Sequence, residues 1–297
     1  AIRTMEKNRD VILGVKVRLS KSIAGDHDLE ALRLAKEAAD AVNLPVMVHI
    51  GNTFSPVKTI LGMLTKGDVV THSFHGREGG ILDGRGRVLK EVRAAVERGI
   101  NLDVGHGAGS FAFDVAEKAF KQGVRPGTIS SDVHQYNVNG PVYDLATCVT
   151  KFLHLGISLD DALKRVTSVP AQIIHLQDRI GTLAQGAWGD AVLFELREGT
   201  FQLIDAQGEA RTGTQNLVPI TVIKAGKIYR QGISFDGHFR VNGDWVGIQA
   251  IFIQVVQELI NSVRPFGEHL ARDSVTVVCE LPEVEFEGLH AILIHQL

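Results

Sequence analysis

The sequence predicts an α/β protein in which a parallel β-sheet with covering helices is followed by a small β-domain. From Val11 to about Leu176, short runs rich in β-branched residues alternate with longer segments whose apolar residues recur at helical spacing. The short runs end in polar residues, as strands that lead into a functional edge do. From Ile180 onward, short strand-like runs are separated by glycine-containing turns, a pattern typical of a separate β-domain.

We expect the parallel sheet to contain five strands, at residues 11–20, 45–51, 68–74, 100–107 and 128–132. Segments with helical spacing lie between and after them, at residues 29–42, 55–64, 87–99, 111–123, 141–155 and 158–168. Ser55 and Ser158 are predicted to cap two of these helices, because a serine hydroxyl accepts a hydrogen bond from the first helical turn.

The pattern divides the chain into three parts. Residues 1–177 carry the alternating strands and helices, and residues 178–232 carry the strands of the small β-domain. Residues 233–297 form an unassigned α/β tail without a recognisable motif. In this tail we expect a helix over 246–263, a strand over 275–281 and a terminal helix over 289–297.

Composition excludes several classes of function. The 297 residues include 31 Lys and Arg against 34 Asp and Glu without a basic stripe, which argues against nucleic acid as the main partner. The longest apolar stretch, 246–260, is interrupted by Gln and Glu and falls short of the roughly 20 apolar residues of a membrane span. Cys148 and Cys279 cannot build a disulfide framework, so we expect a cytoplasmic protein with a small-molecule ligand.

Side chains suited to metal binding or proton transfer fall in or at the ends of all five predicted strands. They are Lys16, His49, His72, His106 and Asp132. The carboxyl ends of parallel strands converge, and barrel-facing positions are ordinarily filled by Val, Ile and Leu. Singly, His49 and His72 also fit hydrogen-bonded core residues, and Asp132 also fits a helix N-cap. Their occurrence on successive strands favours a common site.

Lys16 is the least expected of these residues, because it lies between Val15 and Val17. An unpaired ammonium inside a barrel must be neutralised or paired. Either a carboxylate partner meets it, or CO2 carboxylates it into an anionic oxygen ligand that can bridge two metals. Asp132 would then bind one metal and move a proton between the attacking water and the leaving group.

The sequence resembles the amidohydrolase superfamily, and within it the dihydroorotase-like amidohydrolase/deacetylase metallohydrolases. The similarity covers most of residues 1–232, in the order of the family, and does not extend into the tail. The matching segments are GVKVRLS (14–20), PVMVHIGN (45–52), DVVTHSFHGREGGILD (68–83), RGINLDVGHGAGSFAFDVA (98–116), the segment 129–163 that begins ISSDVHQYN, TSVPAQIIHL (167–176) and GTLAQGAWGDAVLFEL (181–196).

This resemblance implies a (β/α)8 TIM barrel with a small β-domain and two Zn2+ ions bridged by carboxylated Lys16. By position, His49 and His72 resemble the ligands of the more exposed metal. Asp132 resembles the aspartate that binds the buried metal and acts as general acid and base. The residues that would line the substrate pocket are Arg18, His75, His106 and His134.

One departure from the family pattern concerns its first strand, which carries a His-x-His pair. This pair occurs nowhere in the sequence, and the first recognisable strand here matches strand four. The resemblance therefore implies a partial metal-dependent hydrolase barrel, strands four to eight, over residues 1–177. We expect such an open sheet to expose an apolar edge and face, which residues 233–297 could cover.

The expected function is zinc-dependent hydrolysis of an amide C–N bond, with removal of an acyl group from an N-acyl amino-acid-like molecule. One alternative is a cyclic-amide hydrolase of the dihydroorotase or hydantoinase type. Another is a catalytically inactive homologue that serves as an interaction module. A serine hydrolase is disfavoured because no G-x-S-x-G motif is present. We expect neither a membrane nor a nucleic-acid partner, and the sequence leaves a homo-oligomer open.

Overall fold

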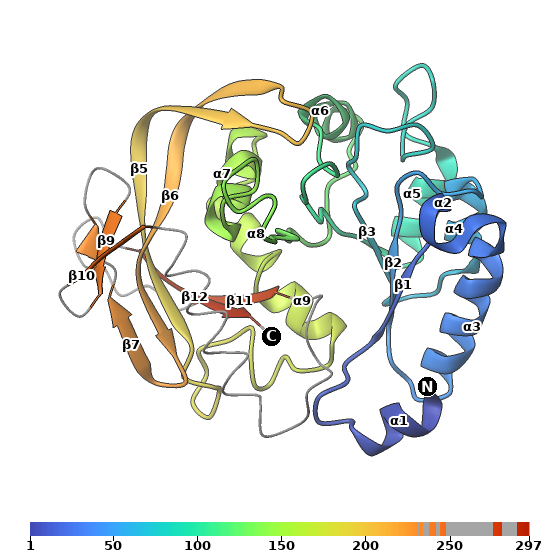
Figure 1. The fold of residues 1–297 in the computed structure, drawn as a ribbon, viewed down its shortest axis with the longest axis horizontal. Coiled ribbons are helices and arrows are strands. Elements are labelled where there is room, and N and C mark those ends of the chain that lie inside the picture. Colours follow the sequence, from blue (N-terminus) through green and yellow to red (C-terminus); the bar gives the residue numbers. More distant parts are fainter. Residues whose placement is uncertain (231, 234–237, 242–243, 248–275, 281–289, 297) are drawn as a thin grey trace.

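The fold is a partial (β/α) barrel joined to an antiparallel sheet. The computed structural model describes residues 1–230, 232–233, 238–241, 244–247, 276–280 and 290–296. Four parallel strands lie side by side in sequence order: β1 (Val15–Arg18), β2 (Val46–His49), β3 (Val69–Thr71) and β4 (Asn101–Leu102). Helices that follow or precede them are α1 (Ile2–Lys7), α2 (Lys21–Ala24), α3 (Asp28–Asp40), α4 (Val57–Met63), α5 (Lys90–Glu97) and α6 (Phe113–Lys121). Helices α3, α4 and α5 pack on one side of the sheet (Figure 1).

The two faces of the parallel sheet differ in character. The face toward the helices is apolar and fully buried, and its residues include Val46, Val48, Val70 and Leu102. On the other face, Arg18 pairs in register with His49, and His49 pairs with Thr71. The expectation of an exposed apolar face is therefore wrong for the described residues, because side chains alternate and the open face carries the polar set.

The fifth predicted strand, 128–132, is not a strand. It lies beside the end of β4 in parallel, with one bridge between Asp103 and Thr128. Backbone hydrogen bonds continue from His106 N to Ser130 O (3.1 Å) and from Gly107 N to Ser131 O (3.0 Å). The segment thus occupies the expected place next to β4, but the left-handed backbone at Asp132 (φ 48°) ends the pairing. The other four predicted strands are confirmed in shorter form.

Helix ends show where sequence patterns succeed and fail. The Ser158 hydroxyl caps α8 (Leu159–Lys164) by accepting a hydrogen bond from Asp161 N, as predicted. Ser55 does not cap α4, which begins at Val57 after Pro56. Its hydroxyl instead donates to the buried Asp28 carboxylate at 2.7 Å, because a tertiary partner of full charge outcompetes a helix end.

The predicted helix over 158–168 is confirmed in shorter form. Helix α8 ends at Lys164, and a separate helix α9 (Ser168–Ile173) follows. The backbone of Thr167, with φ and ψ of −126° and −92°, is not helical. The side-chain hydroxyl of Thr167 donates to Leu163 O at 2.6 Å. The preceding predicted helix over 141–155 is confirmed as α7 (Leu145–His154).

The antiparallel part is built on two strands longer than the predicted ones. They are β5 (Ala191–Ile204) and β6 (Ala210–Lys224), followed by β7 (Lys227–Arg230). The pairing of β5 with β6 is interrupted by a register shift between Glu198 and Phe201, so Gly199 lies within β5 rather than in a turn between strands. In Figure 1 these strands form the long ribbons on the left, with α7 and α8 between them and the parallel sheet.

The tail differs from its prediction. Short strands occur at β8 (Gly232–Ile233), β9 (His238–Val241) and β10 (Asp244–Gly247). The strand predicted over 275–281 is confirmed as β11 (Thr276–Glu280), whereas most of the helix predicted over 246–263 lies outside the described residues. The predicted terminal helix is wrong: β12 (His290–Gln296) is a strand that pairs with β5 and β11. A short apolar run fits either a helix or a strand, and here pairing with the edge of β5 favours the strand.

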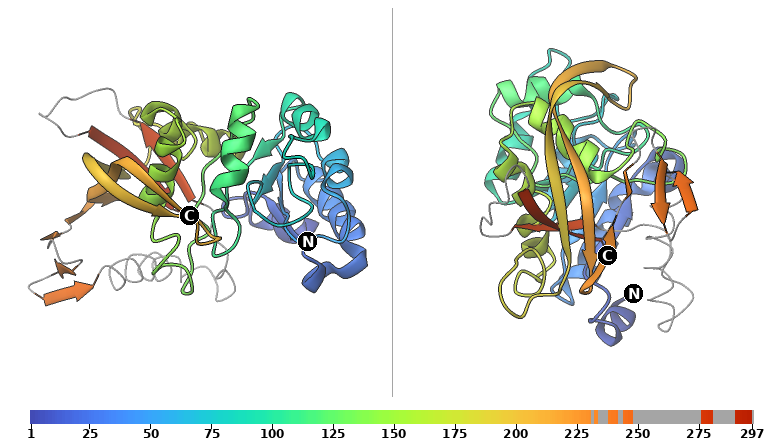
Figure 2. Two further views of the ribbon diagram at one scale, coloured as in Figure 1. Left: turned by 90° about the horizontal axis from the view of Figure 1, so that it is seen from above. Right: turned by 90° about the vertical axis from the view of Figure 1, so that its left-hand side faces the viewer.

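The long β5–β6 hairpin is attached to the barrel part at its tip and along its length. The carboxylate of Asp205, which is buried, accepts from Phe113 N at 2.9 Å at the start of α6. The Thr150 hydroxyl of α7 accepts from Leu217 N at 3.0 Å. Figure 2 shows the hairpin wrapped against α6 and α7. In the part of the chain that the structure describes, no helix has the length and apolar character needed to cross a membrane.

Candidate active site

The candidate site lies where the parallel strands end. His49 is the last residue of β2, and His72 directly follows β3. Their rings meet edge to face with centroids 4.2 Å apart. Burial, with the neighbouring His72, Arg18 and Lys16 next, lowers the pKa of His49 to about 3. The two adjacent imidazoles are therefore neutral at pH 7, and histidine binds a metal in its neutral form.

His72 is held in one orientation. Its Nδ1 lies 2.6 Å from the carbonyl oxygen of Gly105, which can only accept, so Nδ1 carries the proton and Nε2 keeps its lone pair. Metal-binding histidines are characteristically anchored in this way. The backbone of His72 is left-handed (φ 65°), an uncommon conformation that concentrates at functional sites. A side chain at position 105 would lie 2.2 Å from the Thr71 hydroxyl, so glycine is required there.

Asp132 faces the same region from the neighbouring segment. Its backbone is also left-handed (φ 48°), and its carbonyl accepts from Asn137 Nδ2 at 2.9 Å. The carboxylate is exposed and lies against Gly107, where an added Cβ would approach Oδ2 to 2.8 Å. The negative charge of Asp132 raises the pKa of His72 and partly offsets the lowering caused by burial. Asp132 is therefore within electrostatic reach of the histidine pair.

Lys16 is exposed rather than enclosed in a barrel interior. The reason is the sheet itself: β1 is the outermost strand of the four, so the open face around Lys16 meets solvent. The premise that Lys16 is enclosed in a barrel interior is therefore wrong for the described residues. Its positive charge nevertheless lowers the pKa of both His49 and His72, which places it in the same charged neighbourhood.

His75 is the clearest unsatisfied group in this region. It is 2% exposed, and its Nδ1 accepts from Arg77 N at 3.1 Å. Its Nε2 is buried and has no hydrogen-bond partner among the described residues. Burial, with the charge of Arg77 next, lowers the pKa of His75 to about 4. A buried polar atom without a partner costs stability, so it fits a group kept for a ligand.

His106 is fully buried. Its Nδ1 donates to Gly107 O at 3.0 Å, so its Nε2 accepts from Lys151 Nζ at 2.8 Å. Lys151 also donates to Pro141 O at 2.6 Å and is 1% exposed. Sequence reasoning missed Lys151, although it lies between Cys148 and Phe152 on the apolar side of α7. A lysine on such a stripe was the signal that could have found it.

Two further predicted substrate residues are exposed. Arg18 donates from Nε to the Ser20 hydroxyl at 3.2 Å. His134 accepts from Tyr136 N at 3.2 Å within its own turn, and its ring meets the Tyr136 ring edge to face. The charge of Arg18 contributes to the lowered pKa of His49, whereas His134 is not among the groups that shift it.

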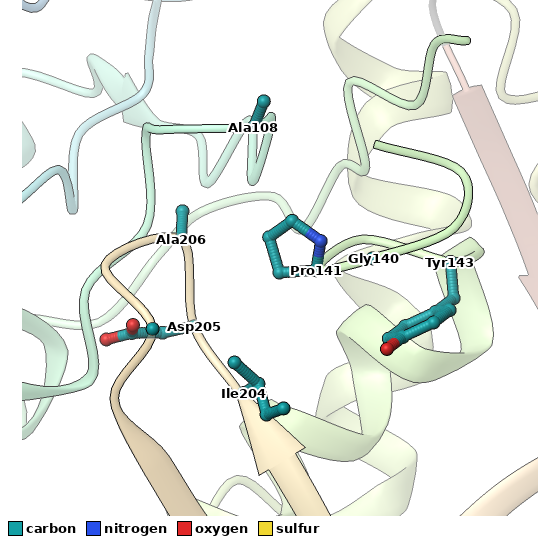
Figure 3. A pocket seen from close by; sticks show the side chains of 8 residues that line it. Ala108, Gly140, Pro141, Tyr143, Ile204, Asp205 and Ala206 are labelled. Carbon is teal, nitrogen blue, oxygen red and sulfur yellow. The ribbon is translucent and has the colours of Figure 1, made fainter. Parts of the chain in front are cut away.

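A shallow pocket of about 300 Å³ lies beside this site but includes none of its residues. Figure 3 shows it between the loop after β4, the turn before α7 and the tip of the β5–β6 hairpin. Its lining is mostly apolar and consists of Ala108, Gly140, Pro141, Tyr143, Ile204, Asp205, Ala206 and Gly208.

The donor set matches part of a metal site. Two neutral imidazoles, one with its Nδ1 anchored, fit a divalent ion such as zinc. Across the described residues, no three His, Cys, Asp or Glu side chains come close enough to hold a metal by themselves. A fuller ligand set from this chain would require Lys16 in carboxylated form together with Asp132.

A model of the amidohydrolase family matches residues 4–229. The chain belongs to this family. The amidohydrolase is 36% identical over 230 residues to a deacetylase of Enterococcus faecalis, covering 76% of the chain and 62% of the relative. It is 35% identical over 202 residues to a deacetylase of Brucella anthropi, covering 68% and 50%. The family predicted from the sequence is thus confirmed.

Solved structures agree with the partial barrel. An adenine deaminase superposes on this amidohydrolase with a TM-score of 0.74 at 36% identity, covering 77% of the chain and 62% of the deaminase. A dihydroorotase gives a TM-score of 0.70 at 31% identity with the same two coverages. The chain spans 62% or less of the length of the two deacetylases, the adenine deaminase and the dihydroorotase.

Proposed function

We propose that this amidohydrolase acts in metal-dependent hydrolysis of an amide C–N bond, removing an acyl group from an N-acyl amino-acid-like small molecule. The observation that carries the proposal is the oriented His72 ring, with Nδ1 fixed on Gly105 O and the His49 ring beside it. The relatives named deacetylase support the type of bond that is cleaved.

The residues that would hold the metal are His49, His72, carboxylated Lys16 and Asp132. Zinc is the proposed ion, because imidazole and carboxylate oxygens are among its usual ligands. A bound ion of this kind supplies a polarised carbonyl and a hydroxide at neutral pH. Burial keeps His49 neutral at that pH, so it enters the site without first losing a proton.

The remaining chemistry falls to side chains of the chain itself. The exposed Asp132 carboxylate can take a proton from the attacking water and return it to the leaving nitrogen. The Asp132 carboxylate lies against Gly107. The partnerless Nε2 of His75 can bind a polar group of the substrate.

A second candidate is hydrolysis of a cyclic amide. The dihydroorotase at a TM-score of 0.70 favours it, because the same donors would serve that substrate. Hydrolysis of linear N-acyl amino acids, compared with hydrolysis of dihydroorotate and hydantoins, separates the two candidates. Release of a free amine and an acid supports deacylation, whereas ring opening supports the alternative.

Asp132→Asn tests the proton transfer. We expect turnover to fall by ~100-fold or more, because the amide cannot accept the proton, while much of the zinc stays bound through the other ligands. Rates of N-acyl amino acid hydrolysis and zinc by elemental analysis are the two measurements. Near-normal turnover in Asp132→Asn would remove the residue from the mechanism.

Lys16→Ala is the contrasting variant, in which zinc content falls and short-chain carboxylic acids restore part of it. A wild-type chain that binds no zinc would support the inactive homologue.

A further inference from the structure

A buried carboxylate joins three segments that carry or adjoin residues of the candidate site. Asp103, at the end of β4, is 2% exposed. It accepts hydrogen bonds from Thr71 Oγ1 at 2.6 Å, Thr128 Oγ1 at 2.6 Å and Ser130 Oγ at 2.7 Å. These hydroxyls come from the end of β3 and from the 128–132 segment. Sequence reasoning assigned Asp103 no role.

The fold has no evident need for a charge at this position. Within the described part of the chain, no Lys or Arg forms an ion pair with Asp103, so its stabilisation comes from the hydroxyl groups. Charge-assisted hydrogen bonds of this kind are short and directional. An apolar cluster of similar volume would stabilise the fold as well or better. What the carboxylate adds is a fixed geometry between the segments that it joins.

One branch of this network leads to His72. The Ser130 hydroxyl, which donates to Asp103, also accepts from Gly105 N at 3.0 Å. The carbonyl oxygen of Gly105 accepts the hydrogen bond from His72 Nδ1. Thr71, which donates to Asp103, is the residue directly before His72. Asp103 thus constrains the histidine both through its backbone and through the acceptor of its ring.

The other branch leads to Asp132. Thr128 and Ser130 lie four and two residues before Asp132, and both donate to Asp103. The Asp132 carboxylate rests against Gly107, whose N–H donates to Ser131 O at 3.0 Å. The short segment that carries Asp132 has one β-bridge and a few backbone hydrogen bonds to the residues after β4. The hydroxyl contacts to Asp103 add to this short pairing.

We propose that Asp103 is a positioning residue that fixes the His72 imidazole and the Asp132 carboxylate relative to one another. The proposal rests on the function proposed above. It assigns no contact between Asp103 and substrate or metal. Its effect passes through three hydroxyl groups and the peptide of Gly105.

The test compares Asp103→Asn and Ser130→Ala with Asp68→Asn. Asp68 is an equally buried carboxylate at the opposite end of β3, where it accepts from Val46 N, Thr65 and Lys36. The first readout is the ring tautomer of His72 in metal-free protein, measured by long-range 1H–15N NMR and assigned by its loss in His72→Gln. The second is zinc affinity, measured by competition with a chelator.

In the wild type we expect His72 to carry its proton on Nδ1. Asp103→Asn and Ser130→Ala should give a mixture of tautomers and a zinc affinity about 10- to 100-fold weaker, the usual range for partners that orient a ligand. Asp68→Asn should lower thermal stability and leave both readouts unchanged. Ser130→Ala removes one hydroxyl and covers the case in which Asp103→Asn does not fold.

The proposal is overturned if both variants keep the Nδ1 tautomer and wild-type zinc affinity, or if Asp68→Asn changes them equally. A wild-type protein without zinc affinity would refute the proposed function alone. In that case the NMR readout still decides for or against the positioning role, because it requires no metal.

Discussion

Buried titratable residues define the chemistry of this protein at the scale of single side chains. His106 and Lys151 form a pair in which neither group reaches solvent. Burial, with the charge of Lys151 next, lowers the pKa of His106 to about 3. Burial also lowers the pKa of Lys151. The folded state therefore keeps His106 neutral, while the unfolded chain takes up a proton near pH 6.5.

This difference predicts a loss of stability in acid. As the pH falls from 6.5 toward 3, the unfolded state binds a proton at His106 that the folded state refuses, so the free energy of unfolding decreases. For this group the loss is about 2 kcal/mol between pH 6.5 and about pH 5. His106→Gln retains an acceptor for Lys151 but does not titrate, so its stability should depend less on pH. Urea unfolding of both proteins at two pH values measures the difference. Identical pH dependence in wild type and variant would contradict the prediction.

Capping interactions show at the scale of elements how local sequence sets helix boundaries. The Asp144 carboxylate accepts from Thr147 N at 2.6 Å and begins α7, the helix that carries Lys151. The Ser158 hydroxyl makes the corresponding contact for α8 at 3.2 Å. Most other helices in the described residues begin without a side-chain cap, so packing positions them.

Asp144→Ala should therefore destabilise the protein by about 1–2 kcal/mol, because Thr147 N loses its acceptor at the start of a buried helix. Ser158→Ala is the matched variant, and we expect a smaller loss because its hydrogen bond is longer and more exposed. Thermal unfolding of both variants provides the comparison. An equal loss of stability in both variants, or a larger loss in Ser158→Ala, would show that exposure does not determine how much a cap stabilises the protein.

At the scale of the whole molecule, the β5–β6 hairpin joins the antiparallel sheet to the parallel one. Asp205 at its tip is 1% exposed and accepts from Gln207 N and Glu209 N in the turn, and from Phe113 N in α6. Arg211 of β6 pairs with Glu117 of α6 at 2.7 Å. One carboxylate therefore both closes the turn and attaches it to the barrel part.

Asp205→Ala should lower stability by about 1–3 kcal/mol, because it leaves the buried Phe113 N–H without an acceptor. Amide hydrogen exchange at Phe113 should accelerate together with exchange in the hairpin turn. Asp83→Ala is the control, because that carboxylate closes only its own exposed turn through Arg85 N and Arg87 N. Unchanged exchange at Phe113 in Asp205→Ala would show that the hairpin tip is not coupled to α6.

The candidate site was predictable to the extent that its residues follow strands. His49, His72 and Asp132 could be found because a polar residue that ends an apolar strand marks the carboxyl edge of a sheet. Asp103 could not be assigned, because its role depends on hydroxyl partners 25 to 32 residues away. Lys151 stands out on the apolar side of α7, but its partner could not be assigned, because His106 lies 45 residues away. The exposure of Lys16 could not be predicted either, because it follows from the position of β1 at the edge of the parallel sheet in the described residues.

The order of strands and helices, the apolar face of the sheet and the family were determined by the sequence alone, because each depends on local periodicity or motif spacing. Tertiary structure decided that 128–132 stays short of a strand and that 290–296 pairs with β5. It also decided that Asp28, not α4, receives the Ser55 hydroxyl. In each case two local conformations lie close in energy, and a partner distant in the chain selects one of them.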